Sequence, residues 1–206
     1  MSRCYFWVEN ALKTHLRASL VQQNFSRLVN ARHKGRGGDG RGEDPNAKPP
    51  HFEFLDKRAA RAQDLNALSG KILRINAETG EGLPDNPFYT GNPKDNKSRV
   101  WDYGLRNPFR FTQNPETGEL LVGDVGWNLW EEINTGKGKN FGWPCFEGSM
   151  DENLPQPGFE SNPDFVSLCQ PLYDADNKAV TSPIYSYATD KGGAVVVGPI
   201  YNGTAY

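Results

Sequence analysis

Two short sequences in the middle of the chain bring together residue types from which a ligand site could be built. Arg106, Asn107 and Pro108 combine a planar cationic fork that suits carboxylates, an amide that donates and accepts, and a ring that stiffens the loop. Residues 123–128 (Gly-Asp-Val-Gly-Trp-Asn) follow, and their glycines let backbone carbonyls converge on a hard cation such as calcium. These patterns predict a site for an anionic ligand and a cation. Two plainer interpretations stay open: an arginine that binds loop carbonyls, and a tight turn without an ion.

Acid-base catalysis has no clear candidate in the sequence. The three histidines, His15, His33 and His51, all lie in or beside an N-terminal block of unusual composition. No Ser-His-Asp or Cys-His arrangement can be argued from them. The catalytic residues therefore stay unassigned.

Composition excludes several classes of function. Lys and Arg number 23 against 25 Asp and Glu, which gives a net charge of -2 and a pI of about 5.9. This balance creates no field that would gather nucleic acid. The sequence contains no apolar run of the roughly 18 residues that a membrane span needs, and no signal peptide is recognisable. With 22 Gly, 15 Pro and a mean hydropathy of -0.70, the chain is predicted to be a loop-rich, all-β protein.

Short strands separated by turns are expected to position the two candidate sequences. Residues 71–76 alternate polar and apolar side chains, which predicts a strand, and residues 120–122 and 131–133 indicate two more. The sequence Glu-Thr-Gly-Glu begins at residue 78 and again at residue 116, a spacing that fits one blade of a β-propeller. A last hairpin is predicted from residues 184–187 and 194–201.

The composition changes near residue 50. Residues 1–50 gather Arg, Lys, Gly and Pro, so this block is predicted to be disordered or to reflect a mispredicted gene start, with a mitochondrial transit peptide as the alternative. Residues 51–206 form the predicted β domain. A disulfide between Cys145 and Cys169, which flank a loop rich in Pro, Asn and Asp, is the preferred pairing, and two buried free thiols are the alternative.

The order of motifs over residues 101–145 is distinctive. Besides the two candidate sequences, it contains Trp-Asp-Tyr-Gly-Leu at 101–105, Leu-Trp-Glu-Glu-Ile-Asn at 129–134 and Asn-Phe-Gly-Trp-Pro-Cys at 140–145. This order resembles the soluble quinoprotein glucose/sorbosone dehydrogenase family, with a match over about residues 52–206. The resemblance implies a six-bladed β-propeller, of which the chain would hold an incomplete arc of about three to four blades after an irregular N-terminal segment.

The resemblance also implies site residues, because members of the family bind pyrroloquinoline quinone (PQQ) and calcium. Arg106 and Asn107 match the pair that lines the cofactor and substrate pocket, and Trp127 is expected to line it too. The carbonyls of Gly126 and Trp127 match those that bind the calcium in contact with PQQ. A second, structural calcium would use Glu132 and the carbonyl of Phe141.

The implied reaction is oxidation of a sugar C1 hydroxyl or aldehyde by hydride transfer to PQQ, followed by an external electron acceptor, in an extracellular or periplasmic setting. Because the general-base histidine of the family has no recognisable counterpart, we expect the chain as given to be an inactive part of such an enzyme. The alternatives are a non-catalytic extracellular propeller that binds a glycan or a protein partner, and a pseudogene product without a stable fold. An interaction propeller has less need of a cation-and-carboxylate pocket, so the residues favour the enzyme.

Overall fold

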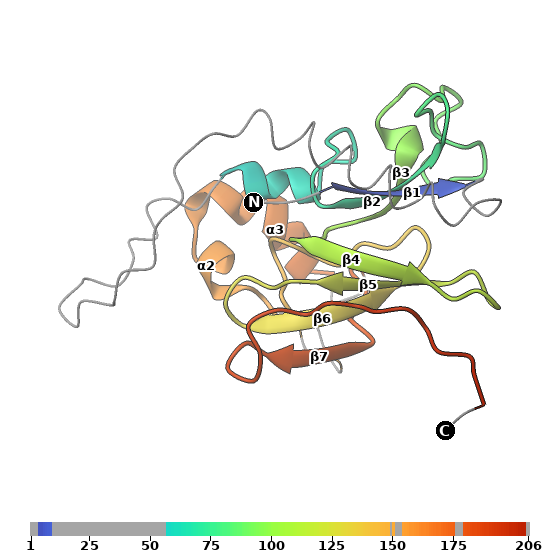
Figure 1. Cartoon of the computed structure of the whole chain (residues 1–206). Helices are drawn as coiled ribbons and strands as arrows, with labels where there is room; N and C mark the ends of the chain where they lie inside the picture. The colour runs from blue at the N-terminus through green and yellow to red at the C-terminus, as the bar shows by residue number, and fades with distance from the viewer. Residues whose placement is uncertain (1–3, 10–56, 149, 151–153, 176–178, 205–206) are drawn as a thin grey trace, which may run out of the picture.

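The computed structural model describes residues 4–9, 57–148, 150, 154–175 and 179–204, and within them the strands form two sheets (Figure 1). The larger sheet has four antiparallel strands in sequential order: β4 (Pro108–Gln113), β5 (Leu120–Asp124), β6 (Trp130–Thr135) and β7 (Tyr185–Ala188). This up-and-down order is typical of one propeller blade. The strands predicted over residues 120–122 and 131–133 are confirmed.

The smaller sheet has three strands in the order β1-β2-β3. β2 (Lys71–Asn76) is the strand predicted over residues 71–76, and it pairs antiparallel with β3 (Val100–Tyr103). On its other edge β2 pairs in parallel with β1 (Cys4–Glu9). The block of residues 1–50 therefore contributes one strand, whose sequence is rich in the aromatic and β-branched residues that favour strands. The rest of that block, with His15 and His33, lies outside the described residues, as does His51.

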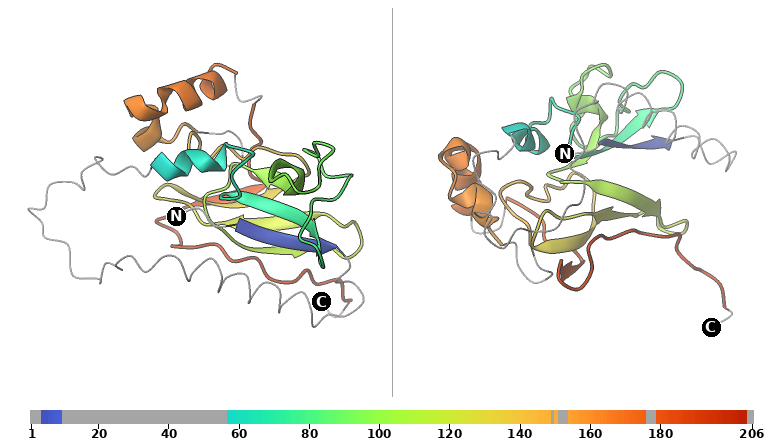
Figure 2. Two further views of the ribbon diagram at one scale, coloured as in Figure 1. Left: turned by 90° about the horizontal axis from the view of Figure 1, so that it is seen from above. Right: turned by 60° about the vertical axis from the view of Figure 1, so that its left-hand side comes forward.

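The two sheets lie one over the other, as Figure 1 and both views of Figure 2 show. Apolar side chains from both sheets and from the connections between them fill the contact, because burial removes their surface from water. The members of this cluster are Ile72, Leu105, Leu120, Val122 and Phe141. A second cluster covers the opposite face of β2 and contains Leu73, Ile75 and Val100. The all-β prediction is confirmed in part: the described residues are rich in antiparallel sheet, β1 and β2 pair in parallel, and short helices are present as well.

Short helices form a third layer beside the ends of the strands (Figure 2). They are η3 (Lys57–Ala62), α2 (Pro157–Glu160), η5 (Pro163–Phe165) and α3 (Val166–Tyr173), while η4 (Lys97–Arg99) precedes β3. The predicted disulfide joins Cys145 to Cys169, and Cys169 lies on α3, so the segment between the cysteines is partly helical. Closing this loop stabilises the fold by about 3 kcal/mol through the unfolded state. No helix of the described residues is long and apolar enough to cross a membrane.

The repeated Glu-Thr-Gly-Glu sequences form two turns with the same hydrogen bonds. Asn76 Oδ1 accepts from the N–H groups of Glu78 and Thr79, and the carbonyl of Asn76 accepts from Gly80. Asn114 makes the corresponding three bonds in the second copy, after β4. Gly80 and Gly118 have φ of 70° and 74°, a left-handed conformation that only glycine adopts without strain. The sequence repeat is therefore a structural repeat.

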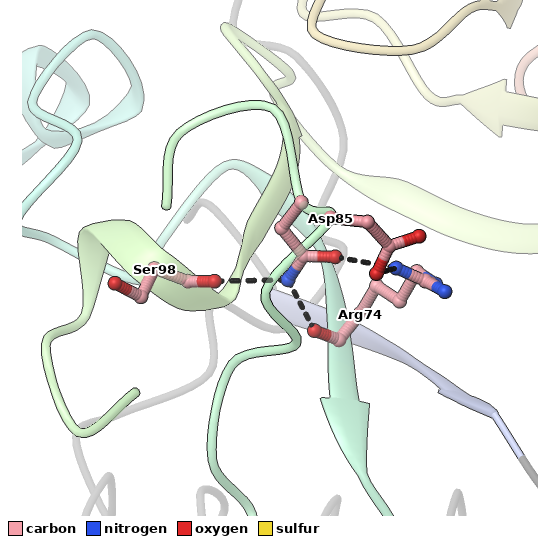
Figure 3. A network of polar contacts seen from close by, with 4 residues as sticks. Arg74, Asp85 and Ser98 are labelled. Atoms are coloured by element: carbon pink, nitrogen blue, oxygen red, sulfur yellow. Dashed lines mark hydrogen bonds and ion pairs between the residues drawn. The ribbon is translucent and has the colours of Figure 1, made fainter. Parts of the chain in front are cut away.

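A polar network, buried except for the exposed Asp85, fixes the long connection between β2 and β3 (Figure 3). Arg74 Nη1 donates to Asp85 Oδ1 at 2.7 Å and to Asn86 Oδ1 at 3.0 Å. Asn86 Nδ2 in turn donates to the carbonyls of Arg74 and Ser98, at 2.7 and 2.9 Å. These bonds tie residues 85–98 to β2, which fixes the position at which β3 joins the sheet. Residues 104–107 therefore reach the start of β4.

Buried Asp102 is expected to make stability depend on pH. Its side chain on β3 is 1% exposed, and Oδ1 accepts from the N–H of Lys139 at 2.8 Å. Burial raises its pKa to about 7, against the opposing effects of that bond and of the Lys139 charge. Because the unfolded carboxyl releases its proton near pH ~4, the native state binds the extra proton between about pH 4 and pH 7, and stability falls as pH rises through this window.

Asp102→Asn tests this expectation, since it keeps an acceptor for Lys139 but cannot titrate. Urea unfolding near pH 5 and near pH 7 should show a larger loss of unfolding free energy in the wild type, by up to about 1.4 kcal/mol per pH unit. If the wild type and Asp102→Asn lose equal unfolding free energy between about pH 5 and about pH 7, Asp102 does not make stability depend on pH.

One expectation needs correction. The hairpin predicted from residues 184–187 and 194–201 forms only one strand, β7; Ala194 instead accepts a hydrogen bond from Tyr187 Oη, and Val195 donates its N–H to Glu131 Oε2 at 3.1 Å. This second segment thus contacts the sheet through side chains rather than joining its edge. The expected arc of about three to four blades stays a prediction; the described strands form one four-stranded and one three-stranded sheet.

Candidate functional site

The two candidate sequences lie side by side because of the strand order. Residues 104–107 lead into β4 and residues 125–129 follow β5, and these antiparallel neighbours pair Pro108 with Asp124. Both connections therefore lie at the same end of the two strands. Arg106 Nη1 donates to the carbonyl of Val125 at 2.9 Å and also to the carbonyl of Gly126. The N–H of Val125 donates to the carbonyl of Asn107 at 3.0 Å, which joins the two connections from the other side.

Asp124, at the end of β5, holds the first connection in place. Its side chain is 4% exposed; Oδ2 accepts from the N–H of Arg106 at 2.9 Å, and Oδ1 from the N–H of Asn107 at 2.6 Å. Burial raises the pKa of this carboxyl to about 7, although the two backbone bonds and the Arg106 charge act in the opposite direction. Asp124 thus orients the backbone of two of the three predicted cofactor-binding residues, Arg106 and Asn107. Asp124 lies within the motif of residues 123–128, but the motif did not predict that it would hold the backbone of residues 106 and 107.

Acidic side chains surround the Arg106 guanidinium. Burial lowers the pKa of Arg106, and the charges of Asp124, Glu147 and Glu131 act against that shift. The Arg106 Cζ also lies 5.6 Å from the centroid of the Trp143 ring, within the range of a cation–π contact. Carboxylates therefore outnumber this cation, so the surroundings of Arg106 favour a further positive charge.

Glu132 and Phe141, predicted to share a structural calcium, have different surroundings. Glu132 on β6 is buried, with Oε1 accepting from Gly148 N–H at 3.0 Å and Oε2 accepting from Asn134 Nδ2 at 3.1 Å. Burial and then the charge of Asp124 raise the pKa of Glu132 well above its usual range. Phe141 packs its ring into the core between the sheets and donates its N–H to the carbonyl of Tyr103. Among the contacts of the described residues, none joins Phe141 to Glu132.

Trp127 and Asn107 also differ in what they contact. The Trp127 ring is partly buried and packs against Phe159 and Trp143, with centroids 5.5 and 6.2 Å away. The Trp127 ring thus packs against α2 and against the segment that contains Trp143. Asn107 Oδ1 is buried and has no hydrogen-bond partner among the described residues, and the same holds for Asn134 Oδ1. Buried oxygens of this kind need a partner, and a hard cation or a ligand donor would supply one.

Two glutamates that the sequence did not single out belong to the site. Glu131 Oε2 accepts from the N–H of Gly126 at 3.3 Å. Glu147 Oε1 accepts from the N–H of Trp127 at 2.6 Å. A local signal existed for Glu131, which follows the glycine motif closely, but Glu147 reaches the loop only through the folding of residues 140–148.

The donor set fits calcium better than it fits a transition metal. Carboxylate, amide and backbone oxygens are the ligands of hard cations, and the site is rich in them. The described residues contain no group of three or more His, Cys, Asp or Glu that could hold a metal ion by themselves. Backbone carbonyls would therefore have to supply part of any coordination shell. Arg106 is the group that fits a carboxylate of PQQ.

The chain is similar to known proteins in sequence. The family described as Glucose / Sorbosone dehydrogenase matches residues 53–197. Aldose sugar dehydrogenase YliI of Escherichia coli is 40% identical over 84 residues, which cover 40% of this chain and 22% of that protein. Quinoprotein glucose dehydrogenase B of Acinetobacter calcoaceticus is 37% identical over 94 residues, which cover 44% of this chain and 18% of that protein.

A solved structure is also similar. The PQQ-bound form of an aldose sugar dehydrogenase from Streptomyces coelicolor superposes with a TM-score of 0.46 at 27% identity, covering 66% of this chain and 30% of that one. The chain thus spans about a fifth of the length of the two curated relatives. The family match covers well over half of the chain. This protein belongs to the glucose/sorbosone dehydrogenase family.

Proposed function

We propose that this chain is part of a PQQ- and calcium-dependent sugar dehydrogenase, which oxidises the C1 hydroxyl or aldehyde of a sugar and passes electrons to an external acceptor. Family membership supports the reaction class. The observation that carries the proposal is the contact of the Arg106 guanidinium with the carbonyls of Val125 and Gly126, near the buried carboxylates of Asp124, Glu131 and Glu147. An extracellular or periplasmic setting is part of the same proposal, and the disulfide is consistent with an oxidising compartment.

Each part of the site has a defined task in this proposal. The carbonyls of Gly126 and Trp127 bind calcium beside the cofactor, and Glu132 binds a second calcium together with the carbonyl of Phe141. Arg106 and Asn107 bind the polar groups of PQQ. PQQ held there would supply a hydride acceptor for the substrate, and a calcium ion held by the carbonyls would supply a Lewis acid.

The remaining residues act by placing these groups. Asp124 fixes the backbone of Arg106 and Asn107 through two hydrogen bonds, so both side chains leave the loop in a set direction. The rings of Trp127, Trp143 and Phe159 pack against one another, and the Trp143 ring lies against the Arg106 guanidinium, so they bring apolar surface to this part of the site. A low local dielectric strengthens every charge interaction inside. Residues 51–206 are proposed as the propeller part of the enzyme, and its general base is not among the described residues, which contain no histidine.

Arg106→Ala tests the proposal directly. Titration of the chain with PQQ in excess calcium, followed by absorbance, should show binding weakened by about 1.5 to 3 kcal/mol, the value of a hydrogen bond to a charged group. Arg110→Ala is the matched control, because Arg110 lies on β4, four residues beyond Arg106, and its side chain is exposed.

Equal quinone affinity in the Arg106 variant and the wild type would remove Arg106 from the site. A wild-type chain that folds but binds neither PQQ nor calcium would favour the non-catalytic propeller instead. A dye-linked assay with glucose should show no turnover by this chain even with both added, because no described residue can serve as the histidine base.

A further inference from the structure

One carboxylate oxygen accepts from four consecutive amides, three at the end of the loop after β5 and one at the first residue of β6. Glu147 lies two residues beyond Cys145 and is 2% exposed. Its Oε1 accepts from four consecutive N–H groups: Trp127 at 2.6 Å, then Asn128, Leu129 and Trp130 at 3.3 Å each. Amides that converge in this way form an anion-binding nest, and here a side chain of the same protein fills it.

This arrangement fixes the direction of the loop carbonyls. In a trans peptide the N–H and the C=O of one unit point in opposite directions. The N–H of Trp127 shares its peptide unit with the carbonyl of Gly126, and the N–H of Asn128 shares its unit with the carbonyl of Trp127. Glu147 therefore turns both of these carbonyls away from itself.

The hydrogen-bond partners of the carbonyls of residues 126, 128 and 129 agree with that geometry. The Gly126 carbonyl accepts from Arg106 Nη1, on the side of the candidate cation site. The carbonyls of Asn128 and Leu129 accept from Thr189, through Oγ1 at 3.1 Å and the N–H at 3.0 Å. The loop thus has its amides on Glu147 and its carbonyls on the opposite side.

Glu147 is itself held rigidly. Gln156 Nε2 donates to Glu147 Oε2 at 2.6 Å and to Asn128 Oδ1 at 2.7 Å, and the N–H of Glu147 donates to the carbonyl of Leu154 at 3.0 Å. The N–H of Gln156 donates to the carbonyl of Cys145 at 2.8 Å. The disulfide-linked segment therefore anchors the carboxylate that shapes the loop.

We propose that Glu147 is a positioning residue of the cation site: by holding the amides of residues 127–130 it aims the carbonyls of Gly126 and Trp127 at the bound ion, without contacting that ion. This inference rests on the proposed function and deepens it. It assigns the placement of the calcium ligands to a side chain about twenty residues away in the sequence.

Glu147→Gln provides the test. The variant keeps the size of the side chain but has a single oxygen, so its amide group must face either the four loop N–H groups or the Gln156 Nε2 donor. We expect hydrogen exchange at residues 127–130, measured without ligands, to become about ten-fold faster. Calcium affinity, measured by calorimetry and by Trp-sensitised terbium luminescence, should fall about ten-fold.

The controls separate a positioning role from general destabilisation. Glu116→Gln makes the same chemical change at an exposed turn residue and should alter neither readout. Glu147→Asp keeps the charge on a shorter side chain and should recover part of the calcium affinity. Faster exchange with unchanged calcium affinity, or unchanged exchange, would overturn the proposal.

The wild-type chain gives a test that does not depend on the variant folding. The amides of Asn128 and Leu129 lie outside every strand, yet they should exchange as slowly as those of β6. Exchange as fast as that of the exposed turn at residues 91–92 would overturn the role of Glu147. Protected amides in a chain that binds no calcium would instead overturn the proposed cation site, and with it the purpose assigned to Glu147.

Discussion

Asp124→Ala is expected to lower the free energy of unfolding by about 3 to 5 kcal/mol, because it leaves two buried donors without an acceptor and removes a countercharge from Arg106. The donors are the N–H groups of Arg106 and Asn107, which bond to the carboxylate at 2.9 and 2.6 Å. The burial that raises the pKa of Asp124 to about 7 also means that its charge is costly, which keeps the loss near the lower end at neutral pH.

Urea unfolding at neutral pH measures this loss. Asp190→Ala is the matched control, since Asp190 is 68% exposed and makes only a surface ion pair with Lys191 at 3.2 Å. That variant should stay within about 1 kcal/mol of the wild type. The same result for Asp124→Ala would show that the two backbone donors find other partners, and that Asp124 does not organise the loop.

Local patterns predicted the parts of the fold that depend on near neighbours. The alternation over residues 71–76 became β2, and the repeated Glu-Thr-Gly-Glu became two turns with equal hydrogen bonds, because both depend on side chains a few residues apart. The second arm of the last hairpin failed for the opposite reason. Residues 194–201 have a strand-like composition, but Glu131 binds the N–H of Val195 and draws the segment away from the edge of β7.

The candidate site, too, was predicted only in the parts that residue types indicate. Arg106 and Gly126 could be named from their residue types, and the strand order brings them into contact. Glu147 could not, because nothing near it in the sequence marks a carboxylate that binds four amides about twenty residues earlier. The ring of Trp127 was expected to line the pocket by its type, whereas its contacts with Phe159 and Trp143 depend on where α2 packs.

The shape of the loop after β5 also depends on the absence of a side chain at residue 126. A Cβ there would lie 2.6 Å from Glu147 Oε1 and 2.8 Å from the carbonyl carbon of Trp130, with the Trp130 oxygen nearer still. Real Cβ atoms do not approach backbone so closely, so the loop would have to move. The backbone at Gly126 is not left-handed, which makes the effect purely steric.

Gly126→Ala is therefore expected to cost more than about 3 kcal/mol of unfolding free energy and to abolish calcium binding, since the loop that carries the carbonyls must shift away from Glu147. Gly193→Ala is the matched control: its Cβ would meet nothing within 4 Å, and its backbone is not left-handed either. Urea unfolding measures the loss of unfolding free energy in both variants, and a calcium titration measures their calcium affinity. If Gly126→Ala binds calcium as the wild type does, the carbonyls of residues 126 and 127 are not its ligands, because a loop displaced from Glu147 cannot keep them aimed at the same point.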